Sequence, residues 1–258
     1  MSSSIGMTPG RDLAGRVALV TGAARNIGRA IARSLAAGGA RIMVNANTSR
    51  AQAEETVELI GSAGGSADLH IADVTDPDAV KGLVEAAVKR FGRLDILVNN
   101  AAVRAETPFA DIRLEDWRRV LSTVLDGAFL CSQAALPHLV RAGGGTIINI
   151  GGLTAHKGAD GRAHVITAKA GLAGLTRALA LDLAPHHITV NCVVPGTIET
   201  LRGLPGAPER PQHRRTLPPV GRRGEPEEIA AMVRTLCGPD MRYVTGQSIH
   251  VNGGNFMP

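Results

Sequence analysis

The sequence predicts an α/β fold: one doubly wound parallel sheet of about seven strands with helices on both faces. Three observations predict it. Short apolar runs alternate with longer segments of helical period, the runs are apolar throughout, and no repeat or linker divides the chain. At 258 residues the chain is long enough for a single domain with a full core.

Strands and helices are expected to alternate along the whole chain. The strands are the apolar runs at residues 16–20, 41–45, 67–71, 94–100, 145–150, 188–194 and 248–252. The helices are the segments at 26–38, 51–60, 77–91, 116–141, 162–183 and 226–236. In the first helix Ile27, Ile31 and Leu35 share one face, and the second is ended by Gly61.

Composition excludes several classes of protein. The net charge is +5, but the arginines are scattered and aromatics make up 2%, so we expect no nucleic-acid partner. No run reaches the roughly 18 apolar residues of a membrane span. Residues 1–14 lack the apolar core of a secretory signal and are expected to be a flexible tail before a domain at 15–258. Cys131, Cys192 and Cys237 lack metal-ligand spacing and suit a reducing cytosol, so we expect a cytoplasmic protein without a metal site.

The first strand runs directly into "TGAARNIG" at residues 21–28. Gly22 permits a tight turn, and Gly28 lets the following helix approach the strand closely. The opening amides of that helix can hold a pyrophosphate at its positive end. A glycine after a strand is often only a turn, but one that also opens a helix favours a dinucleotide site.

Six motifs in order make the family resemblance specific: "TGAARNIGRAIA", "ADVTD" (72–76), "LVNNAA" (97–102), "KAGL" (169–172), "VNCVVPGTIET" (190–200) and "TGQSIHVNGG" (245–254). From about residue 14 to the C-terminus the chain resembles the short-chain dehydrogenase/reductase family. The resemblance implies a single-domain Rossmann fold, a nicotinamide dinucleotide and a small-molecule substrate. It also implies a homodimer or homotetramer, for which the helices near 116–141 and 162–183 carry surplus apolar and small residues.

The resemblance also assigns the cofactor contacts. It gives the pyrophosphate to Gly22, Ile27 and Gly28, the adenine to Asp73 and Val74, the adenosine ribose to Asn100 and Ala101, and the nicotinamide to Pro195, Gly196 and Ile198. Asn26 replaces the family's middle glycine, and Ala102 replaces the glycine that ends "NNAG". Asparagine tolerates left-handed backbone better than most residues, so the turn is expected to survive.

The end of the second strand predicts which dinucleotide binds. Family members that use NAD usually place an acid there to hold the ribose hydroxyls. Here "VNANTSR" (44–50) offers Asn47 and Ser49 but no acid before Glu54. Arg25 and Arg50 could instead clamp a 2′-phosphate, although both could equally be solvated surface residues. The predicted cofactor is NADP(H).

The expected catalytic set is incomplete. In the family a tyrosine donates the proton, a lysine four residues later holds the nicotinamide ribose, a serine binds the substrate oxygen, and an asparagine orders water. In "GRAHVITAKAG" (161–171) Lys169 is present, but Val165 stands at the tyrosine position. Gly152 stands at the serine position and Val124 at the asparagine position. The one tyrosine, Tyr243, lies far along the chain, so ordinary carbonyl reduction is doubtful.

Other side chains were weighed as replacements. His164 could act as a donor if the helix start frays, or it could be a surface histidine. Gly152, Thr154, His156 and Val165 are expected to line the substrate site. Residues from about 200 to 224 match a variable lid, and its arginines and prolines would suit an anionic substrate, or simply a solvated loop.

Three functions therefore stay open. The first is an oxidoreductase whose substrate, such as an iminium ion, does not need the tyrosine. The second is a catalytically silent NADP(H)-binding protein or partner subunit. The third is a lyase or isomerase that reuses the cleft.

Overall fold

The computed structural model describes residues 10–200 and 217–258. The strands are β1 (Val17–Val20), β2 (Arg41–Ala46), β3 (Ser66–Ile71), β4 (Ile96–Asn99), β5 (Gly145–Ile150), β6 (Ile188–Pro195) and β7 (Ser248–Val251). The α-helices are α1 (Asn26–Ala37), α2 (Arg50–Ser62), α3 (Pro77–Phe91), α4 (Leu114–Leu121), α5 (Gly127–Arg141), α6 (Thr154–Lys157), α7 (Ala163–Leu183) and α8 (Pro226–Cys237). The predicted alternation of strands and helices is confirmed.

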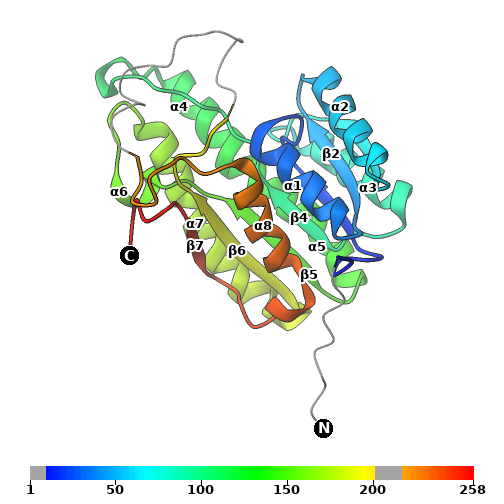
Figure 1. The fold of residues 1–258 in the computed structure, drawn as a ribbon. Helices are drawn as coiled ribbons and strands as arrows, with labels where there is room; N and C mark the ends of the chain where they lie inside the picture. Colours follow the sequence, from blue (N-terminus) through cyan, green and yellow to red (C-terminus); the bar gives the residue numbers. More distant parts are fainter. Residues whose placement is uncertain (1–9, 201–216) are drawn as a thin grey trace.

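All seven strands form one parallel sheet in the order β3-β2-β1-β4-β5-β6-β7. Helices α1, α2 and α8 pack on one face around Val20, Ile31 and Val193. Helices α3, α5 and α7 pack on the other around Leu83, Leu139 and further apolar residues. Figure 1 shows α1 and α8 in front of the sheet, with α5 and α7 behind it. The predicted doubly wound Rossmann fold is confirmed.

The parallel order brings six strand ends to one edge of the sheet. The glycine turn follows β1, Asn47 follows β2, Asp73 follows β3, Asn100 follows β4, Gly152 follows β5 and Gly196 follows β6. The order of the strands reverses between β1 and β4, and ligands of open α/β sheets bind at the carboxyl edge beside such a reversal. The candidate site lies along this edge.

The helix expected at 116–141 is interrupted. A π-helix at Ser122–Asp126 joins α4 to α5, so Leu114–Arg141 is one continuous helical run. By length and composition alone that run could cross a membrane, as a core helix of a soluble fold also could. Val120, Val124 and Ala128 are buried in a third apolar cluster with Ala168 of α7. These contacts give the run a core-facing stripe.

The domain begins earlier than expected. Leu13 was assigned to a tail ending at residue 14, but it is buried in the core and its N–H donates to the carbonyl of Gly38 at 2.8 Å. Asp12 forms an ion pair with Arg234 of α8. The expected boundary at residue 15 is therefore wrong, because an apolar side chain just before β1 fills the end of the first core cluster.

Candidate active site

The glycine turn after β1 is shaped by close backbone contacts. A Cβ at Gly22 would lie 2.9 Å from the Cα of Ala101, and Gly22 has a φ of +62°. A Cβ at Gly28 would lie 2.4 Å from the carbonyl oxygen of Gly22. Contacts this short leave no room for a side chain. Glycine is therefore required at both positions, and we call this turn at the start of α1 the cradle, since such turns can bring backbone N–H groups close to a phosphate.

Asn100 holds the glycine turn in place. Its Nδ2 donates to the carbonyl oxygens of Thr21 at 2.9 Å and Gly22 at 3.0 Å. The hydroxyl of Thr21 in turn accepts from the backbone N–H groups of Asn100 and Ala101, both at 3.0 Å. The ribose contact expected of Asn100 and Ala101 remains a prediction, but their role in supporting the turn is visible.

Asn26 adopts the left-handed backbone conformation expected at a position where the family has glycine. Its φ is +51°, in the left-handed region, and it is the first residue of α1. Asparagine reaches this region at lower cost than most side chains. The turn therefore survives the substitution, and Ile27 follows it half-buried against the first core cluster.

The residues expected at the adenine end of the site lie after β2 and β3. Asn47 Nδ2 donates to Asp73 Oδ2 at 3.0 Å, and Asp73 accepts from the backbone and hydroxyl of Thr75. The backbone N–H of Thr75, together with these side-chain donors, holds the pKa of Asp73 below its usual value. Val74 is buried and packs on Gly127, where a Cβ would lie 2.8 Å from Val74 Cγ2.

The two arginines proposed for a 2′-phosphate border the same end. Arg25 precedes α1 and is exposed, and Arg50 begins α2 with Ser49 just before it. Arg50 lies 3.7 Å from Glu54 in an exposed ion pair, which is worth little in water. Both guanidinium groups therefore remain accessible to an anion at the ends of β1 and β2.

Lys169 is buried on α7 with an exposed fraction of 9%. Its Nζ donates to the carbonyl of Ile150, the last residue of β5, at 2.5 Å. Burial lowers the pKa of Lys169 to about 8, an effect that nearby Cys192 opposes and the charge of Arg104 strengthens. The lysine therefore titrates close to neutral pH at the point where β5 ends.

Gly152 and Val165, expected at the family's serine and tyrosine positions, lie near this lysine. A Cβ at Gly152 would have its nearest neighbour, Lys169 Cγ, at 3.8 Å, so the space beside the glycine is open. Val165 lies one helical turn before Lys169 and is half-buried against the third apolar cluster. Thr154 begins the short helix α6 and is half-buried. Among these four residues only Lys169 carries a titratable group.

Val124 lies inside the π-helix and is 2% exposed. A π-helix shifts the backbone hydrogen bonds to i→i+5 and is often found at functional sites. The irregular backbone is therefore present at the expected asparagine position, although the side chain there is a hydrocarbon. Nothing in the sequence pattern predicted it, because Val120, Val124 and Ala128 keep an α-helical spacing of four.

His164, weighed as a donor, is buried, and His156, expected to line the substrate site, packs against β7. His164 lies inside α7, is 0% exposed, and neither ring nitrogen has a hydrogen-bond partner within residues 10–200 and 217–258. It is four residues before Ala168, so it shares the stripe facing the third cluster rather than that of Lys169. His156 packs edge-on against His250 of β7, with ring centroids 4.5 Å apart, and near Phe256. The frayed helix start assumed for His164 is not observed.

The residues expected to border the nicotinamide lie where β6 ends. Pro195 closes the strand, a Cβ at Gly196 would lie 2.6 Å from Asn252 Cα, and Ile198 is buried and bridged to Gly224. Of the lid expected at about 200–224, residues 201–216 lie outside the described residues. Within the rest, Arg223 pairs with Glu199 at 3.2 Å.

One residue at this edge was missed by sequence reasoning. Arg104 follows β4, is exposed, and its Nη1 donates to the hydroxyl of Thr200 at 3.3 Å. The two residues are 96 positions apart. The sequence could have indicated this residue. Strands β4 and β6 flank β5 in this fold, so an arginine just after β4 is expected near the carboxyl edge of the sheet, where the candidate site lies.

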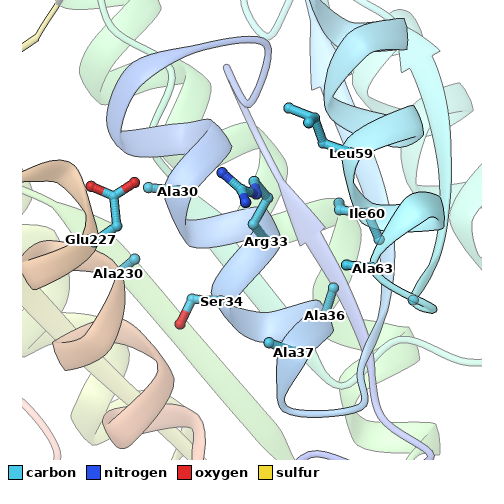
Figure 2. A pocket seen from close by; sticks show the side chains of 11 residues that line it. Ala30, Arg33, Ser34, Ala36, Ala37, Leu59, Ile60, Ala63, Glu227 and Ala230 are labelled. Atoms are coloured by element: carbon cyan, nitrogen blue, oxygen red, sulfur yellow. The ribbon is translucent and has the colours of Figure 1, made fainter.

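The molecule also has a groove away from this edge. It has a volume of about 380 Å³ and is lined by the C-terminal half of α1, by α2 and by α8, including Arg33, Ile60 and Glu227. Figure 2 shows Arg33 between the two flanking helices. None of the predicted site residues lines it. In the part of the chain that the structure describes, no group of three metal-ligating side chains occurs either.

Comparisons with known proteins agree with the fold. Residues 22–255 match the family model described as enoyl-(acyl carrier protein) reductase. The chain is 39% identical over 248 residues to 3-oxoacyl-[acyl-carrier-protein] reductase FabG of Vibrio cholerae, covering 95% of this chain and 99% of that protein. A short-chain dehydrogenase/reductase from Serratia marcescens superposes with a TM-score of 0.87 at 37% identity, over 95% of this chain and 99% of that one. Acetoin dehydrogenase YohF from Salmonella typhimurium superposes with a TM-score of 0.84 at 36% identity, over 93% of this chain and 95% of that one.

Proposed function

Because the chain belongs to the short-chain dehydrogenase/reductase family, an oxidoreductase family, we propose that it is an NADP(H)-dependent oxidoreductase with a non-standard active site. One observation carries the proposal. Gly22 and Gly28 form a tight turn after β1 and Lys169 is buried, while Gly152 and Val165 stand at the positions expected for the family's serine and tyrosine. The chain thus keeps what binds a cofactor and lacks the usual proton donor.

The preference for NADP(H) is supported by the exposed Arg25 and Arg50 and by the absence of an acid from residues 44–50. Guanidinium groups bind phosphate through two parallel N–H donors, whereas an acid would repel it. Calorimetry with NADPH and NADH tests this, and equal affinities would refute it. The matched variant is Arg25→Gln, with Arg119→Gln on the exposed side of α4 as the control.

The substrate that best fits the missing donor is an imine in its protonated, iminium form. Bound NADPH supplies a hydride to the substrate carbon. An iminium substrate would need no proton from the protein, because its C=N π electrons would become the nitrogen lone pair when its carbon took the hydride. Lys169 would hold the nicotinamide ribose, and the open space at Gly152 would admit the substrate. Positioning alone can contribute several powers of ten in rate.

A second candidate is reduction of a 3-oxoacyl thioester, which is the activity in the name of the Vibrio relative. This reaction needs one proton on the carbonyl oxygen as well as a hydride on carbon. Lys169 is the side chain suited to give it, because its pKa of about 8 leaves the ammonium populated near neutral pH. His164 is buried in α7, so the start of that helix would have to open before His164 could donate the proton.

The test follows NADPH absorbance with three substrates: 2-methyl-1-pyrroline, acetoacetyl-CoA and the diketone 2,3-butanedione. Turnover of the imine alone supports the proposal. Turnover of acetoacetyl-CoA that is lost in Lys169→Met supports the second candidate and refutes the first. Tight NADPH binding without turnover of any substrate refutes both, and favours the catalytically silent protein. Conversion of a substrate without change in NADPH favours a lyase or isomerase.

We also propose that the protein is a cytoplasmic homodimer or homotetramer. Phe129 and Val140 on α5 and Leu181 on α7 are exposed large apolar residues on the two long helices. Such residues on neighbouring helices are typical of an interface between copies. Three buried cysteines with no disulfide agree with a reducing compartment.

A further inference from the structure

Three aromatic rings from distant parts of the chain pack together beside the last strand of the sheet. They belong to His156 of α6, His250 of β7 and Phe256 of the C-terminal segment, which we define as residues 252–258. The centroid of the His250 ring lies 4.5 Å from that of His156 and 5.0 Å from that of Phe256. The centroids of His156 and Phe256 are 5.8 Å apart. The two histidines thus join the C-terminal segment to the loop after β5 that carries α6.

Two hydrogen bonds support this packing. Lys157, the last residue of α6, donates from its Nζ to Asn255 Oδ1 at 3.0 Å. Asn252 Nδ2 donates to the carbonyl of Phe256 at 2.9 Å and folds the C-terminal segment back on itself. Figure 1 shows the C-terminus beside α6. Because α6 begins two residues after Gly152, the segment packs against the loop that is expected to border the substrate site.

His250 lies where its neutral form fits better than its charged form. Ile249 and Val251 pack against the first core cluster, so His250 between them points to the opposite face of the sheet. Its Nδ1 is buried and has no hydrogen-bond partner in the described residues. A protonated ring carries an N–H at both nitrogens, so Nδ1 would become a buried donor without an acceptor. Burial, and after it the charge of His156, lower the pKa of His250.

The elements around the two rings offer no acid that offsets a positive charge on His250. Their titratable groups are Lys157 of α6, His164 and Lys169 in the first half of α7, Cys192 of β6, Glu227, Glu228 and Arg234 of α8, and the carboxylate of Pro258. Helix α8 packs on the other face of the sheet, where Glu228 pairs with Arg222 and Arg234 with Asp12. In the part of the chain that the structure describes, the pKa of His250 responds to no charge except that of His156.

We propose that His156 and His250 form a pH-sensitive latch, which holds the C-terminal segment against α6 while the rings are neutral and releases it when both are charged. Two imidazolium ions at this separation repel each other, whereas neutral rings pack edge to face. The closed arrangement is most stable above the ordinary histidine pKa of 6.5 and loses stability as the pH falls below it, because it lowers the pKa of His250. The latch is a property of the fold, so it goes beyond the proposed function, and its test needs neither cofactor nor substrate.

The test is fluorine NMR of the full chain labelled with 4-fluorophenylalanine. The chain has four phenylalanines, and Phe256→Leu identifies the signal from the C-terminal segment. Between pH 7.5 and 5.0 that signal should move from a packed to a solvent-exposed position, with the released fraction rising about 5-fold or more. Two unit charges about 4 Å apart repel by about that factor even in bulk water. Phe91, buried on α3, should give an unchanged signal. A Phe256 signal that stays packed at pH 5.0 overturns the proposal.

Variants then assign the response to the two rings. His250→Leu keeps an apolar contact with Phe256 and cannot be charged, so the segment should stay packed at pH 5.0. His156→Gln removes the second charge and should weaken the response. His70→Gln is the matched control, because β3 and β7 are the opposite edges of the sheet, and it should respond like wild type. A full response in either His250→Leu or His156→Gln overturns the assignment, so one variant is enough if the other does not fold.

Discussion

Introducing a serine and a tyrosine at the positions expected for the family's catalytic hydroxyls should create ketone reductase activity in this chain. The change is the double variant Gly152→Ser and Val165→Tyr. The new tyrosine would lie one helical turn from Lys169, and i and i+4 share a helix face. The new serine would lie beside the same lysine. Both replacements enter the cleft and leave the cofactor cradle untouched.

The structure gives the expected cost and gain. A Cβ at Gly152 meets Lys169 Cγ at 3.8 Å, an ordinary contact, and Gly152 is not among the glycines with positive φ. The serine should therefore be nearly free of strain. Val165 is half-buried, so the larger tyrosine could cost about 1–3 kcal/mol of stability. A positioned general acid contributes about 10²–10⁴ in rate, which is the expected gain over wild type.

Val124→Asn is better left out of the first experiment. Val124 is 2% exposed inside an apolar cluster, and a buried amide without partners costs about 1–3 kcal/mol. A triple variant that failed to fold would say nothing about the other two positions. It belongs in a second step, after the double variant has been shown to fold.

The assay is NADPH consumption with 2,3-butanedione, run on wild type, Val165→Tyr and the double variant. Lys169→Met in the double background should remove the gain, because the lysine charge favours the tyrosine phenolate. A double variant that folds and binds NADPH but is no faster than wild type would show that these positions are not equivalent to the family's serine and tyrosine. Fast reduction by wild type would point to a donor already in the cleft.

Three further predictions follow from particular contacts. Gly28→Ala should lose most NADPH affinity by calorimetry, because its Cβ would lie 2.4 Å from Gly22 O; unchanged affinity would contradict the cradle. Lys169→Met should raise the unfolding free energy of the apo-protein at pH 7 by about 1–3 kcal/mol. The sign follows because the pKa of Lys169 is about 8 in the folded protein and 10.5 in the unfolded chain. Below pH 8 the buried ammonium therefore destabilises the wild-type fold, and this destabilisation disappears as the pH rises towards 10.5. A denaturant titration that shows a less stable variant would refute this. The double variant Phe129→Glu and Leu181→Glu should have a lower molecular mass in solution by light scattering, because the charges would disrupt the proposed interface between copies. A wild-type protein that is monomeric in the same measurement would refute that interface.

Local rules predicted most of the fold. The alternation of apolar runs and helical periods located all seven strands, because parallel strands buried on both faces have a distinctive composition. The left-handed Asn26 was predictable from the intrinsic preference of asparagine. These features depend on neighbours in the sequence, and a single chain carries that information.

Contacts between distant residues were not predictable in the same way. Arg104 meets Thr200 only because the sheet places β4 and β6 on either side of β5. The π-helix at 122–126 depends on how α4 and α5 pack against α7, and the four-residue spacing of its buried side chains gives no sign of it. His164 looked available at a helix start, but tertiary packing buries it completely.

Lys169 connects stability with function. Holding an ammonium in a buried site lowers its pKa to about 8, which corresponds to about 3 kcal/mol of folding free energy below that pH. If position 169 served stability alone, an apolar side chain such as those of Val124 and Val165 would make the folded protein more stable. The lysine does not serve the core, because its partner is one backbone carbonyl at the edge of the sheet. The free energy that its burial costs is best explained by a ligand that uses the charge, such as a nicotinamide ribose beside it.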